Sequence, residues 1–234
     1  MWVAGIDEAG RGCLCGSLFV AGVIGEAHII HSLKPKDSKK LSPKKRECIY
    51  EAMQEAQNKD KIAFFLSEIS AEEIDANGLS SAMRKGIESV LAALGDYALK
   101  KQILGVSKEI LGQKSKDFYT QIKDRAQRGK GECERNFTII IDGNTTFNAQ
   151  IPHYLQEAGL KIETLVKADS LLEVVSCASI VAKVCKDRQM RALDVLYPHY
   201  KLAKNKGYGT LEHRKSIAQY GYCPYHRKSF AFSL

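Results

Sequence analysis

The sequence lacks a long apolar run. No uninterrupted apolar stretch approaches the ~18 residues that a membrane-spanning helix needs. The first residues, MWVAGIDEAGRG, carry carboxylates where a secretory signal peptide would carry positive charge, so we expect a cytoplasmic protein with no membrane partner. Repeats and low-complexity tracts are also missing, and the composition, 44% apolar and 26% charged, excludes collagen-like, mucin-like and wholly disordered chains.

The cysteines lack the spacing of a zinc site. There are seven, an odd number, with no pair of CxxC clusters and no histidines at zinc-ligand spacing. We therefore expect reduced thiols. Cys13 and Cys15 form a CxC beside a glycine-rich turn, which we interpret as small residues in a tight bend in preference to half of a metal site.

What the chain does have is length and positive charge. Its 234 residues suffice for one large domain whose core needs no disulfide. A net charge of +8 suits a polyanionic partner, although charge alone does not identify one.

Hydrophobic periodicity predicts an α/β protein. We expect strands at 2–7, 18–25, 62–70, 137–144 and 161–169, the first two forming a hairpin, and helices at 42–58, 78–94, 170–198 and 210–220. Ser42 followed by Pro43 is typical of a helix N-cap and first turn. The run FTIIID, which ends in an acid, is typical of a buried central strand.

The stretch 95–135 differs from its surroundings. It is basic and contains several glycines, and its second half has the composition of an exposed loop. We predict an insertion at about 95–135 that forms a surface element of the single domain 1–234.

Four acids occupy informative positions. Asp7 and Glu8 end the first predicted strand, Asp142 ends FTIIID, and Asp169 follows the strand at 161–169. If the ends of adjacent strands converge, the four carboxylates meet at one edge of the sheet, where their mutual repulsion favours divalent cations. Oxygen ligands without Cys or His favour Mg²⁺ or Mn²⁺, and two such ions about 4 Å apart form the clamp of phosphodiester hydrolysis.

Each acid also has a plain structural interpretation. Acids at strand ends are common as turn residues or helix N-caps, and Asp169 before Ser170 fits a cap. The joint placement of the four favours the metal site.

GIDEAGRG at 5–12 is the most specific string in the chain. Glycines on either side of Arg11 let backbone N–H groups approach a ligand closely. The string resembles the first signature of the ribonuclease HII family, the type 2 ribonucleases H. Seven further blocks resemble that family in its order: DSKKLSPKKR at 37–46, ANGLSSAM at 76–83, DGN at 142–144, VKAD at 166–169, CASIVAKVCKDR at 177–188, KGYGTLEH at 206–213 and HRKSF at 226–230.

The resemblance implies an RNase H-like fold, a mixed central sheet flanked by helices with a C-terminal helical segment. It implies a two-ion Mn²⁺ or Mg²⁺ endonuclease that cuts the RNA strand of RNA–DNA hybrids. It also implies cleavage 5′ to single ribonucleotides in duplex DNA, leaving 3′-hydroxyl and 5′-phosphate ends. By position, Asp7, Glu8, Asp142 and Asp169 match the family's catalytic, metal-ligating acids.

The resemblance also implies a substrate-binding set. Gly10, Arg11 and Gly12 match the family's ribose-reading loop, and Tyr208 matches a tyrosine that stacks on the sugar where RNA gives way to DNA. Six further residues fall in blocks that line the nucleic-acid groove: Lys40, Ser42, Asn77, Ser179, Lys183 and Arg188.

Some features depart from the family pattern. The loop after Arg11 reads CLCGS in place of a proline-containing run, the third acid block reads KAD where KGD is common, and the interval from Asp142 to Asp169 is long. None removes an acid. The tail SFAFSL has no glutamine-led clamp-binding pattern, so no protein partner is indicated and we expect a monomer.

Two alternatives remain open. A junction-resolving nuclease or integrase would share an acidic metal site but would lack GRG and KGYGT. A catalytically silent nucleic-acid-binding protein would use the same basic surface, but it would have no need of four intact acids.

Overall fold

The computed structural model describes residues 1–104 and 137–233. A five-stranded mixed sheet lies at its centre in the order β3-β2-β1-β4-β5. The strands are β1 (Trp2–Ala9), β2 (Leu18–Glu26), β3 (Ile62–Ile69), β4 (Phe137–Asp142) and β5 (Leu160–Leu165). β1, β2 and β3 pair antiparallel, whereas β4 runs parallel to β1 and β5 parallel to β4.

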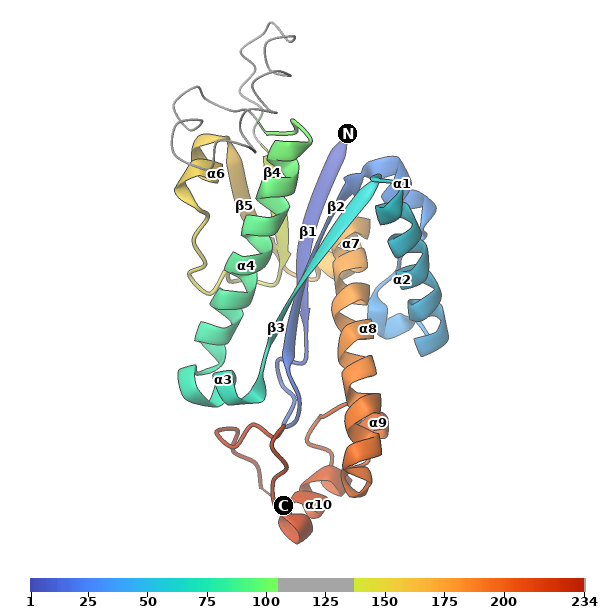
Figure 1. Ribbon diagram of the computed structural model, residues 1–234, viewed down its shortest axis with the longest axis vertical. Helices are drawn as coiled ribbons and strands as arrows, with labels where there is room; N and C mark the ends of the chain where they lie inside the picture. The colour runs from blue at the N-terminus through green and yellow to red at the C-terminus, as the bar shows by residue number, and fades with distance from the viewer. Residues whose placement is uncertain (105–136, 234) are drawn as a thin grey trace, which may run out of the picture.

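Helices cover both faces of the sheet (Figure 1). One face packs on α4 (Leu79–Lys100), the other on α8 (Glu173–Leu196) and α2 (Pro43–Asn58). Shorter elements are α1 (Ala27–Ser32), η1 (Ser38–Lys40), α3 (Ala71–Asn77), α6 (His153–Glu157), α7 (Ala168–Leu171), η3 (Pro198–Tyr200), α9 (Leu202–Asn205) and α10 (Leu211–Tyr220).

The pleat of β1 assigns its side chains to the two faces. Ala4 and Ile6 belong to the apolar cluster beneath α4. Gly5 faces α8, where a Cβ atom would lie 2.6 Å from Val175 Cγ2, so only glycine permits this close approach. Because side chains alternate along a strand, Asp7 points to the α8 side as well.

A third apolar cluster ties the loop after β1 to the C-terminal part of the chain. Leu14 and Cys15 pack there with Met190 and Leu193 of α8 and with residues of the C-terminal segment: Tyr200, Leu202, Ile217 and Cys223. In Figure 1, α9 and α10 gather at the end of the molecule opposite the N-terminus. The loop after β1 is therefore joined to residues near the other end of the chain.

The predicted fold is confirmed, and helix α2 has the predicted start. The Ser42 side chain accepts a hydrogen bond from Lys45 N, and Pro43 occupies the first turn. α3 was not predicted, although Ser70 and Glu73 form a reciprocal capping box there.

Three predicted boundaries were wrong. The strand expected at 161–169 ends at Leu165, and the helix expected at 170–198 is divided at Leu172, whose backbone is extended. The helix expected at 78–94 continues to Lys100, and Leu104 beyond it is buried in the core. Residues 105–135 of the insertion predicted at about 95–135 lie outside the described residues.

Candidate active site

Two acids are placed side by side by strand register. β1 and β4 pair in parallel, with Ile6 opposite Ile141, so the next residue on each strand is Asp7 and Asp142. Both carboxylates accept backbone N–H groups: Asp7 Oδ1 lies 2.7 Å from Glu8 N, and Asp142 Oδ1 lies 2.6 Å from Ala168 N. The second bond attaches the start of α7 to the end of β4.

Asp169 reaches the same region from α7. It is the second residue of that helix, and its N-cap position is held by Lys167 in the left-handed conformation, so Asp169 is not a helix cap. Its carboxylate is buried and lies 3.5 Å from Lys39 Nζ, while its carbonyl accepts a 2.6 Å hydrogen bond from Ser176 Oγ. The structure therefore removes the capping alternative.

The carboxylates perturb one another. Burial, followed by the charges of Glu8 and Asp142, raises the pKa of Asp7 to about 8. Burial also raises the pKa of Glu8, although Arg11 opposes this shift. Lys39 lies among these acids: burial lowers its pKa, but Asp169 and Asp7 outweigh that effect and raise it.

The donor set fits hard divalent cations. Without a cation, buried carboxylates are stabilised only by taking up a proton or by the charge of a nearby lysine. A bound divalent cation stabilises their ionised form directly. Among residues 1–104 and 137–233, only Cys15, Cys223 and His226 bring three potential ligand atoms within 4.8 Å of one another, so no three of the four acids converge that closely.

That cysteine and histidine group has a different character. His226 Nδ1 accepts a hydrogen bond of 2.9 Å from Cys223 N, and His226 Nε2 lies 3.0 Å from His213 Nε2. Both ring nitrogens are thus occupied by protein partners, and no lone pair of His226 is left for a metal. We interpret the group as a hydrogen-bonded core, and Cys13 and Cys15 are free and buried.

The loop after Glu8 turns at glycine. Gly10 has a φ of +92°, and a Cβ atom there would lie 2.9 Å from Ser17 O. Arg11 is half exposed and pairs with Glu8 at 3.2 Å, whereas a Cβ atom on Gly12 would meet nothing within 4 Å. The outer side of Gly12 is therefore open to a ligand.

Two buried cations hold this loop from beneath. Lys186 Nζ donates to Cys15 O and Ser17 O at 2.9 and 3.1 Å. The Arg227 guanidinium donates to Gly16 O at 2.9 Å and Arg11 O at 3.0 Å. In the described part of the chain neither cation pairs with a carboxylate, and burial lowers the pKa of both, that of Lys186 to about 8.

Tyr208 lies against the same loop. It forms an isolated antiparallel bridge with Cys13, and Gly207 O accepts hydrogen bonds from Leu14 N and Cys15 N. Gly207 has a φ of +85°, and its Cβ would lie 2.3 Å from Cys15 O. Tyr208 remains 47% exposed. The structure thus brings Tyr208 together with the loop at 10–12, beside the acids.

The other predicted groove residues lie in varied surroundings. Ser179 is buried, 2.8 Å from Ser38 Oγ, and its hydroxyl hydrogen bond lowers the pKa of Asp7, so it lies beneath the acids and not on an exposed groove surface. Lys183 pairs with Asp187 at 2.7 Å. Ser42 caps α2, and Asn77 Nδ2 donates to Glu73 O at the end of α3.

Arg188 and Lys40 form a contrasting pair. Arg188 donates to Glu47 at 2.7 Å and stacks 4.7 Å from the Tyr50 ring centre, which joins α8 to α2. Lys40 is 72% exposed and only loosely paired with Asp37, at 3.8 Å. The Lys40 ammonium is therefore available to a ligand, whereas the Arg188 guanidinium is already paired with Glu47.

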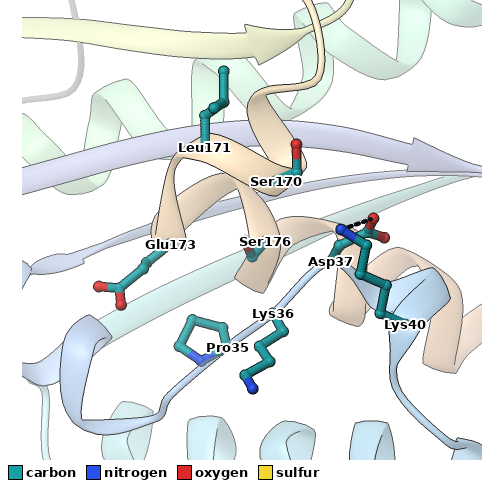
Figure 2. A pocket seen from close by; sticks show the side chains of 8 residues that line it. All are labelled: Pro35, Lys36, Asp37, Lys40, Ser170, Leu171, Glu173 and Ser176. Atoms are coloured by element: carbon teal, nitrogen blue, oxygen red, sulfur yellow. Dashed lines mark ion pairs between the residues drawn. The ribbon is translucent and has the colours of Figure 1, made fainter.

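A cavity of about 220 Å³ adjoins Asp169, between the segment 35–40 and the start of α8. Figure 2 shows Lys36, Lys40, Glu173 and Ser176 among the residues that line it, together with the Asp37–Lys40 ion pair. Its lining carries two lysines, Lys36 and Lys40, and two acids, Asp37 and Glu173, so the cavity is mixed in charge and is not a cationic pocket.

The residues that sequence reasoning missed are mostly buried polar groups. Lys39, not its neighbour Lys40, contacts Asp169, and Ser38, Lys186, His213, His226 and Arg227 support the site from within. All of these lie inside the family-like blocks, but charge and polarity in a sequence do not reveal whether a side chain points inward.

In the residues that the structure describes, no helix has the length and apolarity needed to cross a membrane.

The comparisons with known proteins agree on one family. The model of the ribonuclease HII family matches residues 4–125 and 108–233. A ribonuclease HII of Helicobacter pylori strain G27 is 35% identical over 233 residues, covering 97% of this chain and 90% of the relative.

Two solved structures share the fold. The ribonuclease HII in the complex with PCNA from Archaeoglobus fulgidus is 22% identical, with a TM-score of 0.62 over 100% of this chain and 97% of that one. A Bst ribonuclease HIII in complex with Mn²⁺ is 17% identical, with a TM-score of 0.53 over 94% of this chain and 70% of that one. The family model and a relative that matches nearly the whole chain agree with each other, and the four acids are in place. The chain belongs to the ribonuclease HII family.

Proposed function

We propose that this chain cleaves the phosphodiester bond on the 5′ side of a ribonucleotide, in RNA–DNA hybrids and at single ribonucleotides in duplex DNA, leaving 3′-hydroxyl and 5′-phosphate ends. Its family makes it an RNase H endoribonuclease that acts on RNA–DNA substrates with a divalent metal ion. The finer specificity is the proposal, and so is a site for two Mg²⁺ or Mn²⁺ ions.

The observation that carries the proposal is that the acids lie next to the loop at 10–12. Asp7 and Glu8 end the same strand whose following loop contains Gly10, Arg11 and Gly12, and Tyr208 is bridged to that loop at Cys13. A nuclease centre and a sugar-reading loop are thus held within a few residues of each other. This arrangement supports cleavage coupled to recognition of a ribose.

The acids would act together. Asp7, Glu8, Asp142 and Asp169 would hold the ions, which supply an activated water and stabilise the leaving oxygen. The chain keeps these carboxylates in place through backbone N–H groups at Asp7 and Asp142 and through Ser176 on the Asp169 carbonyl. Lys39, with its ammonium near Asp169, contributes positive charge at the edge where a phosphate would enter.

Discrimination between RNA and DNA needs contacts other than phosphate contacts. Both nucleic acids carry the same phosphates, so only the 2′-hydroxyl and the local shape of the helix distinguish them. The open face of Gly12 permits backbone contact with a hydroxyl, and the exposed ring of Tyr208 can pack on the neighbouring deoxyribose, where a second hydroxyl would crowd it.

Backbone binding would come from exposed cations. Lys36 and Lys40 rim the cavity next to Asp169, and Lys40 is weakly paired. Such contacts make affinity depend on salt but carry no sequence information.

The test uses a DNA duplex that contains one ribonucleotide, labelled on the strand that carries it. With Mg²⁺ or Mn²⁺ we expect one cut, immediately 5′ of the ribonucleotide, and a 3′-hydroxyl end that a polymerase can extend. A duplex with deoxyribonucleotide in its place should remain intact. Cutting of the all-DNA duplex would indicate a nuclease of another specificity. Binding without any cut under both metals would indicate a silent nucleic-acid-binding protein.

A further inference from the structure

Two buried histidines connect the C-terminal turn to Tyr208. His213 is in α10 and His226 in the turn beyond it, and they are 0% and 1% exposed. Three contacts join them in series: Cys223 N to His226 Nδ1 at 2.9 Å, His226 Nε2 to His213 Nε2 at 3.0 Å, and His213 Nδ1 to Tyr208 O at 2.9 Å. The series begins at a backbone N–H and ends at a backbone carbonyl.

The two ends determine where the protons lie. A carbonyl oxygen only accepts, so His213 Nδ1 must carry a hydrogen and donate it to Tyr208 O. A backbone N–H only donates, so His226 Nδ1 must carry a lone pair. The central contact then holds a single hydrogen, donated by His226 Nε2 to the bare Nε2 of His213.

An extra proton would break the series. On His213 it would place two N–H groups face to face at the central contact, and on His226 it would face the N–H of Cys223. Both rings are therefore neutral. Burial, which is the main factor, and the neighbouring His226 lower the pKa of His213, in agreement with this assignment.

The series ends on an exposed part of the chain. Tyr208 follows Gly207, whose φ is +85°, and Tyr208 is 47% exposed. Its carbonyl also accepts a hydrogen bond from Thr210 N at 2.8 Å. Because about half of Tyr208 is exposed, the direction of its ring depends on how its backbone is fixed.

We propose that His213 is a positioning residue for substrate recognition: its Nδ1–H fixes the Tyr208 backbone, and His226 fixes the tautomer of His213. This rests on the proposed function, in which the Tyr208 ring packs on a sugar. Neither histidine touches the substrate, and both act through Tyr208.

The first test is independent of activity. Nitrogen NMR of the uniformly ¹⁵N-labelled full chain at neutral pH distinguishes the two neutral imidazole tautomers and the imidazolium form. We expect one ring, assigned to His213, in the less usual Nδ1–H form, and His226 in the Nε2–H form. Finding His213 as Nε2–H, or either ring protonated, overturns the proposal without any variant having to fold.

The second test uses a matched pair of substitutions. The amide of Asn lies where Nδ1 of histidine lies, and that of Gln lies near Nε2. His213→Asn therefore keeps a donor for Tyr208 O, whereas His213→Gln removes it. His153→Gln, at an exposed histidine of α6, is the control.

We expect His213→Gln to raise KM for a duplex with one ribonucleotide by about tenfold, with kcat nearly unchanged and cleavage of a long hybrid affected much less. His213→Asn should restore most of the loss, and His153→Gln should match the wild type. Equal behaviour of the Asn and Gln variants, or equal losses on both substrates, overturns the proposal. Tyr208→Ala is measured in parallel: if it leaves substrate preference unchanged, the proposed role of Tyr208 fails, whereas an effect of Tyr208→Ala with none of His213→Gln refutes the positioning role alone.

Discussion

The acid cluster at the ends of β1 and β4 and the support beneath the loop at 10–17 are built in opposite ways. At the acids, like charges are crowded, and the pKa of Asp7 is raised to about 8 by burial and by its neighbours. Under the loop, Lys186 and Arg227 are buried without a carboxylate partner in the described part of the chain, but their N–H groups bind four backbone carbonyls. One region is left short of positive charge, and the other has its polar groups satisfied.

The difference separates chemistry from recognition. A cluster of acids gains free energy when a cation binds, so its repulsion in the free protein is what gives it affinity for metal. A loop that must measure a 2′-hydroxyl needs a fixed shape, which saturated hydrogen bonds provide. Substitutions in the first region should thus change turnover, and those in the second should change selectivity.

The largest effect is expected at Asp7 and Asp142. Asp7→Asn or Asp142→Asn should lower kcat by orders of magnitude, because each removes a charge from the metal clamp. Binding of hybrid in Ca²⁺ should survive, since the basic surface is unchanged, and the Tm should stay the same or rise with one fewer buried acid. Single-turnover cleavage and a binding titration check this pair of outcomes. Near wild-type cleavage by either variant would refute the metal-site assignment.

Tyr208→Ala should produce the next largest effect. Removing the exposed ring should reduce cleavage at a single embedded ribonucleotide by about tenfold, which is the scale of one sugar or base stacking contact. Cleavage within a long hybrid should fall far less, because every position there offers a ribose. Parallel kinetics on the two substrates, with circular dichroism to verify the fold, make the comparison. Equal losses would mean that the junction is sensed elsewhere.

The acid site was more predictable from sequence than its support. Asp7, Glu8 and Asp142 end strands whose apolar pattern is easily read, and register alone places Asp7 beside Asp142. Arg227 and Lys186 lie in basic, polar segments, where the same letters usually denote exposed side chains. Their burial depends on contacts between residues 169 to 216 positions apart, which no local pattern encodes.

The boundaries that failed have the same origin. The predicted helix at 170–198 breaks at Leu172 because Asp142 and Ser176 hold the backbone at Ala168 and Asp169 in a short separate helix. That break is imposed by tertiary hydrogen bonds, not by a weak helix former. Ser179 and Arg188 lie on the helix predicted for them, but Ser179 faces inward and Arg188 binds Glu47.

Lys186 should leave a pH signature on stability. Its pKa is lowered by burial to about 8 in the folded chain, against 10.5 for an ordinary lysine, so between these values the unfolded state binds more protons. The free energy of unfolding of the wild type should therefore rise with pH from about 8 to 10.5, by ~1–3 kcal/mol relative to Lys186→Met. Denaturant titrations of both proteins at pH 7.5, 9 and 10 measure the difference. Parallel curves would show that Lys186 has an ordinary pKa.

The smallest effect distinguishes two cations that sequence reasoning assigned to one groove. Lys40 is exposed and loosely paired, so Lys40→Gln should flatten the dependence of log Kd on log salt by about one phosphate contact. Arg188 is paired with Glu47, so Arg188→Gln should leave that slope unchanged. It should lower the free energy of unfolding by at most ~1 kcal/mol, as expected for a partly exposed ion pair. Binding of hybrid in Ca²⁺ at several salt concentrations compares the two variants. A reduced slope for Arg188→Gln would mean that Arg188 exchanges Glu47 for phosphate when the nucleic acid binds, and that the α2–α8 ion pair is itself part of the groove.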